Sequence, residues 1–378
     1  VMRQVWDIFC VVVDNYGDIG VTWRLARQLV AEHNVQVRLW VDDLSAFVRL
    51  CPRADAQASA QQQAGVEIRH WPAQWQPVAV ADVVIEAFAC QLPAPYLADM
   101  QASVRKPLWL NLEYLSAEDW VGGCHALPSL QGGGLQKFFY FPGFRADTGG
   151  LLRELGLLEA RDAFVSQAES RAGFLQRLGI RLADNEQLYS LFTYECAGLP
   201  DWLQTLAEGA EKVLLLVPEG RVLGSVQAWL GEGELQVGDA CTRGRLRVQV
   251  LPFVSQEDYD RLLWSCDFNA VRGEDSFVRA LWAGKPLLWH IYQQADDAHL
   301  QKLEAFVQLY LEQMPDEPAQ ALRTFWQAWN TGEPLVLSWQ ALQAQWPQVQ
   351  RHARNWSIRQ AAQRDLAAGL AHFCANWL

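Results

Sequence analysis

Short apolar runs alternate with helix-like stretches along the chain, and this alternation limits its possible folds more than any other feature. The runs of the first half are residues 6–13, 35–41, 66–71, 82–88, 107–115 and 138–144. The runs of the second half are residues 187–195, 212–220, 246–253, 266–271 and 285–291. Continuous apolar strands separated by helices are typical of parallel sheets covered on both faces. The sequence therefore predicts an α/β protein built around two such sheets.

The two series of runs divide the chain into two domains. The pattern of residues 151–182 predicts a helix with breaks. The predicted boundary between the two domains lies near the end of this segment. We expect one domain over residues 1–183 and another over residues 184–354. A C-terminal helix over about residues 355–378 is expected to cross back to the first domain. The length of 378 residues suffices for two domains of ordinary size.

The charge balance of the chain favours a cationic partner over nucleic acid. The sequence has 31 Lys and Arg against 43 Asp and Glu, which gives a net charge of -12 at pH 7. An excess of carboxylates repels a phosphate backbone, whereas it attracts a basic protein or a cationic group. We therefore expect no nucleic-acid partner.

The cysteines and the apolar runs indicate where in the cell the protein works. The eight cysteines are far apart and form no CxxC pair, which fits a reducing cytoplasm. No apolar run reaches the roughly 18 residues of a membrane span, and the N-terminal residues are unlike a signal peptide. The sequence predicts a soluble, cytoplasmic protein with no membrane partner.

The stretch "VVVDNYGDIG" at residues 11–20 places two carboxylates at the turn between the first strand and the first helix. In open α/β sheets this turn is a usual ligand site. A phosphate site here is glycine-rich and binds through backbone amides, so Asp14 and Asp18 favour a cationic ligand instead. Gly17 and Gly20 permit a tight turn. In the alternative interpretation, each aspartate is only a cap or turn residue.

A second candidate site is the stretch "RGEDS" at residues 272–276, between a strand and a helix. The start of that helix, the Ser276 hydroxyl and the Arg272 guanidinium would suit a phosphate. In the alternative interpretation, residues 274–276 are favourable helix-start residues and Arg272 is a solvated charge.

A third candidate site is the end of the strand at 246–253 and the first turn of the following helix. Ser255 followed by Asp258 resembles a capping box, so the helix is expected to start there. Phe253 and Gln256 would then offer a nucleotide base a ring face and an amide. Packing of Phe253 in the core is the alternative.

We expect neither a metal nor a cofactor. Asp258-Tyr259-Asp260 has the form of a metal-binding DxD, but residues two apart on a helix diverge and cannot hold one ion. The sequence also lacks an HxxxH pair, a GxxxxGK[ST] loop and a GxSxG elbow. These observations argue against hydrolases, kinases and metalloenzymes.

The stretches at residues 14–29 and 272–292 together closely resemble the bacterial arginine rhamnosyltransferases that modify translation elongation factor P, the EarP family. The resemblance covers essentially the whole chain. It implies a GT-B architecture with two Rossmann-like domains facing a cleft, residues 1–183 binding the acceptor and residues 184–354 the nucleotide sugar. It implies inverting transfer of L-rhamnose from TDP-β-L-rhamnose to one arginine of folded elongation factor P, which activates that factor for translation of stalling sequences. We expect a monomer.

The resemblance also implies roles for residues of this chain. The catalytic carboxylates on the acceptor side correspond to Asp14, Asp18 and Glu274. The residues implied to lie near the donor are Asn15, Gly17, Phe192, Tyr194, Phe253, Gln256, Arg272, Asp275, Ser276 and Tyr292. Among these, Arg272, Asp275 and Ser276 are implied to bind the diphosphate. The nucleotide is implied to lie among Phe192, Phe253, Gln256 and Tyr292, with Asn15 and Tyr194 as neighbouring support.

An arginine acceptor explains the acidic loop. A guanidinium stays protonated and binds carboxylates through paired hydrogen bonds. Because this binding also stabilises the poorly nucleophilic protonated form, we expect proton loss to accompany attack on the sugar C1, with Asp18 accepting the proton. Asp14 and Glu274 would orient the group and offset positive charge on the sugar.

Two other functions stay open on the residues alone. One is a GT-B enzyme that uses another nucleotide sugar on a small cationic acceptor. The other is a noncatalytic module that binds a nucleotide sugar or a protein. Only the resemblance names the sugar, and loss of function on replacing Asp14 or Asp18 would separate an enzyme from a binding module.

Overall fold

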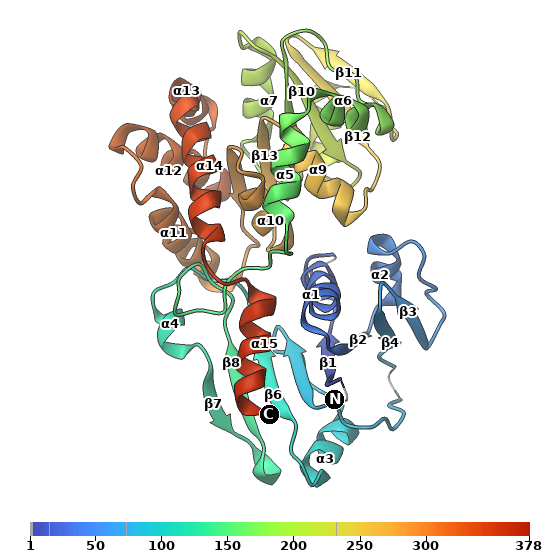
Figure 1. Ribbon diagram of the computed structural model, residues 1–378. Coiled ribbons are helices and arrows are strands. Elements are labelled where there is room, and N and C mark those ends of the chain that lie inside the picture. Colours follow the sequence, from blue (N-terminus) through green and yellow to red (C-terminus); the bar gives the residue numbers. More distant parts are fainter. Residues whose placement is uncertain (1–2, 15, 73, 232) are drawn as a thin grey trace. The chain divides into compact units, whose positions relative to one another are not determined.

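The computed structural model describes residues 3–14, 16–72, 74–231 and 233–378 (Figure 1). The chain forms two compact units. Unit 1 comprises the residues up to Leu155 together with Ala361–Leu378, and unit 2 comprises Gly156–Gln360.

Unit 1 is built on an eight-stranded sheet with the order β3-β4-β2-β1-β5-β6-β8-β7. The central strand β1 (Val5–Cys10) pairs in parallel with β2 (Gln36–Val41) on one side and β5 (Val83–Ala87) on the other. The other strands are β3 (Ala60–Gln63), β4 (Val66–His70), β6 (Leu108–Leu112), β7 (Leu127–Leu130) and β8 (Gln136–Tyr140). The edge strands β3 and β7 run antiparallel to their neighbours. The strand order therefore reverses at β1, which makes the carboxyl end of β1 a topological switch point.

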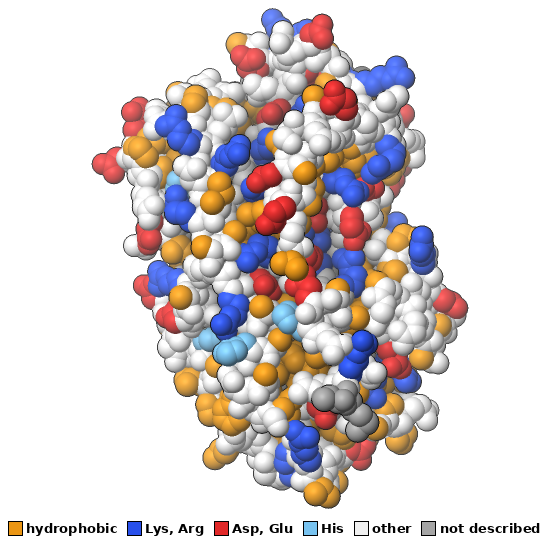
Figure 2. Space-filling view, viewed as in Figure 1, with side chains coloured by type: hydrophobic (Ala, Val, Ile, Leu, Met, Phe, Trp, Pro, Cys, Tyr) orange, Lys and Arg blue, Asp and Glu red, His pale blue; other side chains and the backbone are white. Residues whose placement is uncertain are grey.

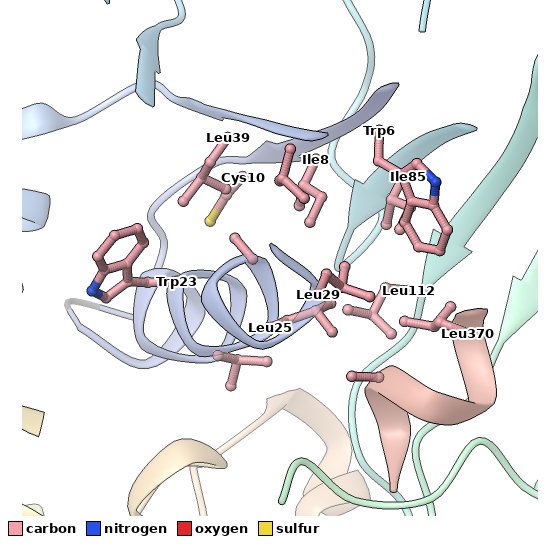
Figure 3. Close-up of a cluster of buried hydrophobic side chains, with 14 of the residues drawn as sticks. Trp6, Ile8, Cys10, Trp23, Leu25, Leu29, Leu39, Ile85, Leu112 and Leu370 are labelled. Atoms are coloured by element: carbon pink, nitrogen blue, oxygen red, sulfur yellow. The ribbon is translucent and has the colours of Figure 1, made fainter. Parts of the chain in front are cut away.

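Helices cover both faces of this sheet. They are α1 (Gly17–His33), α2 (Leu44–Leu50), α3 (Ala94–Ala102), α4 (Trp120–Cys124), the 3-10 turn η1 (Gly132–Gly134) and α15 (Leu366–Trp377). Figure 3 shows side chains of the strands, such as Ile8 and Ile85, gathered in one cluster with those of α1 and α15. Leu25 and Leu29 of α1 and Leu370 of α15 are fully buried there, so α1 packs on the sheet through an apolar stripe.

The C-terminal segment forms two helices, so the single helix expected over residues 355–378 is wrong. Helix α14 (Trp346–Ala361) lies in unit 2 up to Gln360, and α15 begins in unit 1 after the four residues 362–365. The break occurs because Asp365 caps a new helix, its Oδ1 accepting a hydrogen bond from the Ala368 amide at 3.0 Å. The Leu366 amide also donates to the Leu151 carbonyl at 2.9 Å, and this bond holds the start of α15 on unit 1.

Unit 2 is built on a six-stranded sheet with the order β11-β12-β10-β9-β13-β14. Its strands are β9 (Glu186–Leu191), β10 (Lys212–Pro218), β11 (Ala240–Arg243), β12 (Leu246–Leu251), β13 (Phe268–Arg272) and β14 (Leu287–His290). All neighbours are parallel except β11 and β12, which form an antiparallel hairpin. The order reverses at β9, so the carboxyl ends of β9 and β13 meet at the switch point of this sheet.

Helices also flank the sheet of unit 2. They are α5 (Leu157–Ser166), α6 (Ala168–Arg177), α7 (Leu199–Glu208), α8 (Arg221–Leu230), α9 (Gln256–Ser265), α10 (Asp275–Ala283), α11 (Ala298–Leu311), α12 (Asp316–Thr331), α13 (Val336–Ala344) and α14, with the short turn η2 (Ala295–Asp297). Fully buried tryptophans such as Trp202, Trp282 and Trp339 pack between these elements. Core packing therefore accounts for many of the 18 tryptophans of the chain.

Residues 156–183 make their contacts within unit 2. Arg161 of α5 donates to the Trp282 carbonyl at 2.6 Å, and Arg171 of α6 donates to the Ser265 carbonyl at 2.7 and 2.9 Å. The sequence assigned this segment to the acceptor-binding domain. The roles predicted for residues 1–183 and 184–354, binding of the acceptor and of the nucleotide sugar, stay predictions. The division into compact units rests on contacts within the chain and does not show which ligand a domain binds.

The surface is mixed in character. Figure 2 shows basic, acidic and apolar side chains interspersed over the face in view. Among the helices of the described residues, none is both long and apolar enough to span a bilayer.

Candidate functional site

Two carboxylates hold the loop that follows β1 in unit 1. The backbone amides of Val13 and Asp14 donate to Asp18 Oδ2 at 2.9 and 3.0 Å. The preceding amide, of Val12, donates to Asp42 Oδ1 at 2.9 Å. Asp18 is only 3% exposed and is the second residue of α1, so it joins the helix start to the loop. This network fixes the position of the loop at the switch point of the sheet.

Asp14 lies over the first residue of α1. The Gly17 amide donates to the Asp14 carbonyl at 2.7 Å, and a Cβ atom at Gly17 would lie 3.1 Å from Asp14 Oδ2. Glycine at position 17 therefore allows the Asp14 carboxylate to approach the helix start. Asp14 is half-buried, whereas Asp18 is buried, so the two carboxylates differ in their access to solvent. Asn15 lies outside the described residues.

Asp42 is a member of this network that the sequence analysis missed. It directly follows β2, which pairs in parallel with β1, so its side chain and the β1 loop lie at the same edge of the sheet. The signal was available in the sequence, because an acidic residue directly after the second strand belongs at the edge where the first loop lies.

In unit 2, the side chains at the switch point come from the ends of three neighbouring strands. Arg272 ends β13, and its guanidinium carbon lies 5.0 Å from the ring centroid of Tyr194, which follows β9. The Tyr194 ring contacts the rings of His290 and Tyr292, at the end of β14, with centroid distances of 5.2 and 5.8 Å. The structure thus brings together three residues that the sequence placed at the donor site.

His290 belongs to the same group and was not predicted. Burial, followed by the positive charge of Arg272 and the neighbouring His299, lowers its pKa from 6.5 to about 4. Trp329 Nε1 lies 3.2 Å from His290 Nδ1. Because an indole nitrogen only donates, Nδ1 must accept, and the neutral ring carries its proton on Nε2. His290 is therefore an uncharged group beside the Arg272 cation near neutral pH.

The turn from β13 into α10 has the form that the sequence predicted. Gly273 adopts φ 64°, a left-handed conformation that favours glycine, and its carbonyl accepts a hydrogen bond from Trp289 Nε1 at 2.8 Å. Glu274 occupies the N-cap position without a side-chain capping bond, and Asp275 is the first helical residue. Gly284 ends the helix in a left-handed conformation, a common way for a helix to stop.

Other predicted donor residues of unit 2 lie along the same carboxyl edge of its sheet, whereas Gly17 begins α1 of unit 1. Phe253 follows β12 and is 45% exposed, so the alternative interpretation, in which it packs in the core, is wrong. Gln256, the first residue of α9, is buried, and the predicted cap of this helix is confirmed by the Asp258 amide donating to Ser255 Oγ at 3.1 Å. Tyr292 is 48% exposed, which leaves its ring available to a ligand.

A buried tyrosine of α9 contacts the first turn of α10. The Phe192 ring, after β9, lies 5.1 Å from the Tyr259 ring. Burial raises the pKa of Tyr259, and an interaction with Ser276 partly opposes this. Phe192 and Ser276 therefore both lie against one buried tyrosine, although the sequence linked them only through the resemblance.

The two aspartates of the DxD sequence serve separate ion pairs. Asp258 pairs with Arg177 and with Arg261, each at 2.8 Å. Asp260 forms a buried bidentate pair with Arg279 at 2.8 and 2.7 Å. No grouping of three His, Cys, Asp or Glu side chains suited to a metal ion occurs within the described parts of the chain.

The chain is similar throughout its length to known proteins of one kind. It matches the family described as "Elongation-Factor P (EF-P) rhamnosyltransferase EarP" over residues 6–375. The protein-arginine rhamnosyltransferase of Pseudomonas putida is 62% identical over 377 residues, with 100% of both chains covered. That of Pseudomonas aeruginosa is 59% identical over 373 residues, with 99% of both chains covered.

Solved structures extend this similarity to the fold. A structure described as "Structural basis for EarP-mediated arginine glycosylation of translation elongation factor EF-P" is 46% identical, with 100% of both chains covered and a TM-score of 0.72. MurG of Acinetobacter baumannii is 12% identical, with a TM-score of 0.51 over 99% of this chain and 100% of that one, and shares the fold alone. The two Rossmann-like units have the GT-B glycosyltransferase fold, and the chain belongs to the EarP family of elongation factor P rhamnosyltransferases.

Proposed function

We propose that this protein transfers L-rhamnose from TDP-β-L-rhamnose to an arginine of translation elongation factor P, with inversion at the anomeric carbon. Family membership and the names of its close relatives support the reaction type. One observation carries the assignment of roles: the switch point of unit 1 is lined by carboxylates, whereas that of unit 2 carries a guanidinium among aromatic rings. The first suits a cationic acceptor and the second a nucleotide diphosphate.

On the acceptor side, Asp14 and Asp18 bind the guanidinium, and Glu274 of unit 2 acts as a third carboxylate. Asp18 Oδ2 already accepts two backbone hydrogen bonds, so Asp18 Oδ1 is the atom that receives the proton. Half-buried Asp14 orients the arginine. Because these charges keep the arginine protonated before reaction, proton transfer to Asp18 accompanies the attack instead of preceding it.

The transfer is a single displacement. A bond forms between an arginine nitrogen and the sugar C1 while the bond from C1 to the diphosphate oxygen breaks. The diphosphate leaves with the bonding electrons, and the proton lost by the nitrogen goes to Asp18. Attack from the face opposite the leaving group inverts the configuration, and the carboxylates offset the positive charge that develops on the sugar.

On the donor side, Arg272 and the start of α10 bind the diphosphate. Arg272 lies over the Tyr194 ring, which keeps the guanidinium in one place, and Asp275 and Ser276 contribute the first turn of the helix. The exposed rings of Phe253 and Tyr292 stack on the nucleotide, with Phe192 and Gln256 beside it. We propose that these groups stabilise the leaving diphosphate without a metal, so a chelator should leave turnover unchanged.

The acceptor indicates in which compartment of the cell the reaction takes place. A translation factor is made and used in the cytoplasm, so we place the enzyme there.

A single chain suffices for the reaction, since the residues assigned to the acceptor and the donor all come from one copy, and we propose a monomer.

The test is intact-mass spectrometry of elongation factor P after incubation with this protein and TDP-β-L-rhamnose, followed by peptide mapping. The expected result is a gain of one deoxyhexose on one arginine, and nuclear magnetic resonance of the product should show the inverted anomer. The Asp14→Ala variant is the matched control and should give no gain. No added mass from folded wild-type protein that binds TDP would overturn the proposed acceptor or sugar.

A further inference from the structure

Unit 2 has a pocket at the amino ends of its strands, away from the predicted donor residues at their carboxyl ends. The pocket has a volume of about 500 Å³. Glu186 at the start of β9, Asp267 before β13 and Lys285 before β14 line it, together with aromatic side chains of the flanking helices. A volume of this size admits a small molecule.

Lys285 is the unusual group in this pocket. It is partly buried and connects the end of α10 to β14. Among the residues that the structure describes, none forms a hydrogen bond or a close ion pair with its ammonium group. Amines that are buried in this way lose part of the hydration that stabilises their charged form.

Besides Lys285, the pocket is lined by Arg171 and by the carboxylates of Glu186, Glu211 and Asp267. Three of these four groups are already engaged. Arg171 of α6 donates twice to the Ser265 carbonyl, at 2.7 and 2.9 Å. Asp267 Oδ2 accepts from the Leu188 amide at 2.8 Å, and Glu186 pairs with Arg247 at 2.6 Å. These bonds hold the walls of the pocket in place around the lysine.

Burial lowers the pKa of Lys285, and the neighbouring charges act in both directions. The carboxylate of Asp267 opposes the shift, Arg171 of α6 adds to it, the Cys266 thiol opposes it, and Arg354 of α14 adds to it. The net direction is downward. At neutral pH a larger fraction of Lys285 than of an ordinary lysine is therefore an unprotonated, nucleophilic amine.

We propose that Lys285 is a modification site that is acylated by small acyl phosphates. The pocket combines the lysine with the Arg171 cation, which can attract the phosphate, and with aromatic walls from Phe164, Trp264 and Trp346 for the acyl chain. The amine nitrogen forms a bond to the carbonyl carbon, the bond from that carbon to the phosphate oxygen breaks, and phosphate leaves with the electron pair. The proton released by the nitrogen goes to the phosphate. No other reactant is required.

The test uses the intact protein and acetyl phosphate at neutral pH. Peptide mass spectrometry follows acetylation at each lysine of the chain, namely Lys106, Lys137, Lys212, Lys285 and Lys302. Lys285 should be acetylated several-fold faster than Lys212, an exposed lysine at the start of β10 in the same unit. Equal or slower acetylation of Lys285 would overturn the proposal.

A second acylating agent separates the role of the phosphate from that of the amine. With an uncharged N-hydroxysuccinimide ester of acetate, the preference for Lys285 over Lys212 should be smaller than with acetyl phosphate, because Arg171 then has no anion to attract. An equal preference would contradict the proposed acyl phosphate. Lys285→Arg, which keeps the positive charge, should lose only the signal of its own peptide, and labelling elsewhere should be unchanged.

Discussion

The two switch points of this molecule occupy equivalent positions in two Rossmann-like sheets but differ in the charged side chains around their loops. In unit 1 the loop after β1 contains Asp14, and its backbone amides donate to the carboxylates of Asp18 and Asp42. In unit 2 the corresponding edge carries Arg272, held over a tyrosine ring, and a helix start without a side-chain cap. The topology is shared, and the side chains differ.

This difference shows how one fold can present edges suited to ligands of either sign. An anion at a switch point normally uses the backbone amides of the loop and the following helix. In unit 1 the amides of three successive residues, 12–14, already donate to carboxylates, so they cannot serve an anion. The excess negative charge there instead favours a cation. The partners of the loop amides therefore determine which kind of ligand the edge can hold.

The largest expected effect comes from removing the charge of Asp18 while keeping its hydrogen bonds. In Asp18→Asn the side-chain oxygen can still accept from the Val13 and Asp14 amides, so the loop should keep its position. Turnover should fall by roughly 10²-fold or more, because general-base catalysis contributes about that much. The rate of mass gain on elongation factor P measures this effect.

The control for Asp18→Asn is Asp99→Asn, which removes one negative charge from an exposed position on α3. Circular dichroism and the affinity for TDP should be the same in both variants and in the wild type. Near wild-type turnover in a folded Asp18→Asn protein would refute the assignment of Asp18 as the base, and Asp14 would become the candidate.

The next effect is a loss of folding stability at low pH, which arises from the lowered pKa of His290. Its pKa is about 4 in the folded protein and 6.5 in its ordinary state, so only the unfolded chain binds a proton there between these values. Folding stability should therefore fall as the pH drops from 6.5 to 4, by about 3 kcal/mol in total for this group. Hydrogen exchange of the β14 amides measures the loss in the unit concerned.

The matched variant is His290→Gln, which can still accept the hydrogen bond of Trp329 but does not titrate. Its stability should vary less with pH than that of the wild type over the same window. Other groups titrate equally in both proteins, so the difference between the two curves reports His290 alone. Identical curves would mean that the charge of Arg272 and the burial of the ring do not act on His290 as described.

A smaller effect is expected for donor binding through Arg272. Arg272→Gln should weaken TDP binding by about 2 kcal/mol, the usual contribution of a hydrogen bond to a charged group. Arg272→Lys should recover part of this loss, since it keeps the charge but gives up the planar stack on Tyr194. Calorimetry with TDP measures both, and Arg261→Gln on α9, where the side chain is 43% exposed, is the control. Unchanged affinity in Arg272→Gln would remove the guanidinium from the diphosphate site.

The sequence predicted those parts of the fold that follow from local patterns. Apolar runs such as 82–88 became buried strands, because a parallel sheet covered on both faces needs continuous apolar residues. Local patterns failed where a single residue decides the outcome. Asp365 starts a new helix within an otherwise helical pattern, and only its capping bond to the Ala368 amide shows this.

The candidate site was predicted only in part, because its members come from separate strands. Asp14, Asp18 and Arg272 stand in short stretches with a recognisable chemistry. His290 and Asp42 were missed, since each joins its group through the pairing of neighbouring strands, β13 with β14 and β1 with β2. A single sequence shows strands, but it does not show which strand ends meet.

The smallest expected effect tests whether Asp42 contributes to the acidic character of unit 1 or only supports the loop. Asp42→Ala removes one hydrogen bond, from the Val12 amide. The loss of about 1 kcal/mol that this bond contributes should lower kcat/KM for elongation factor P several-fold. Asp42→Asn keeps that bond and removes the charge. Full activity in Asp42→Asn would assign the effect to loop position, and activity as low as in Asp42→Ala would assign it to charge. Wild-type kcat/KM in both variants would show that Asp18 alone holds the loop, which would reduce the contrast between the two switch points to a single residue in each unit.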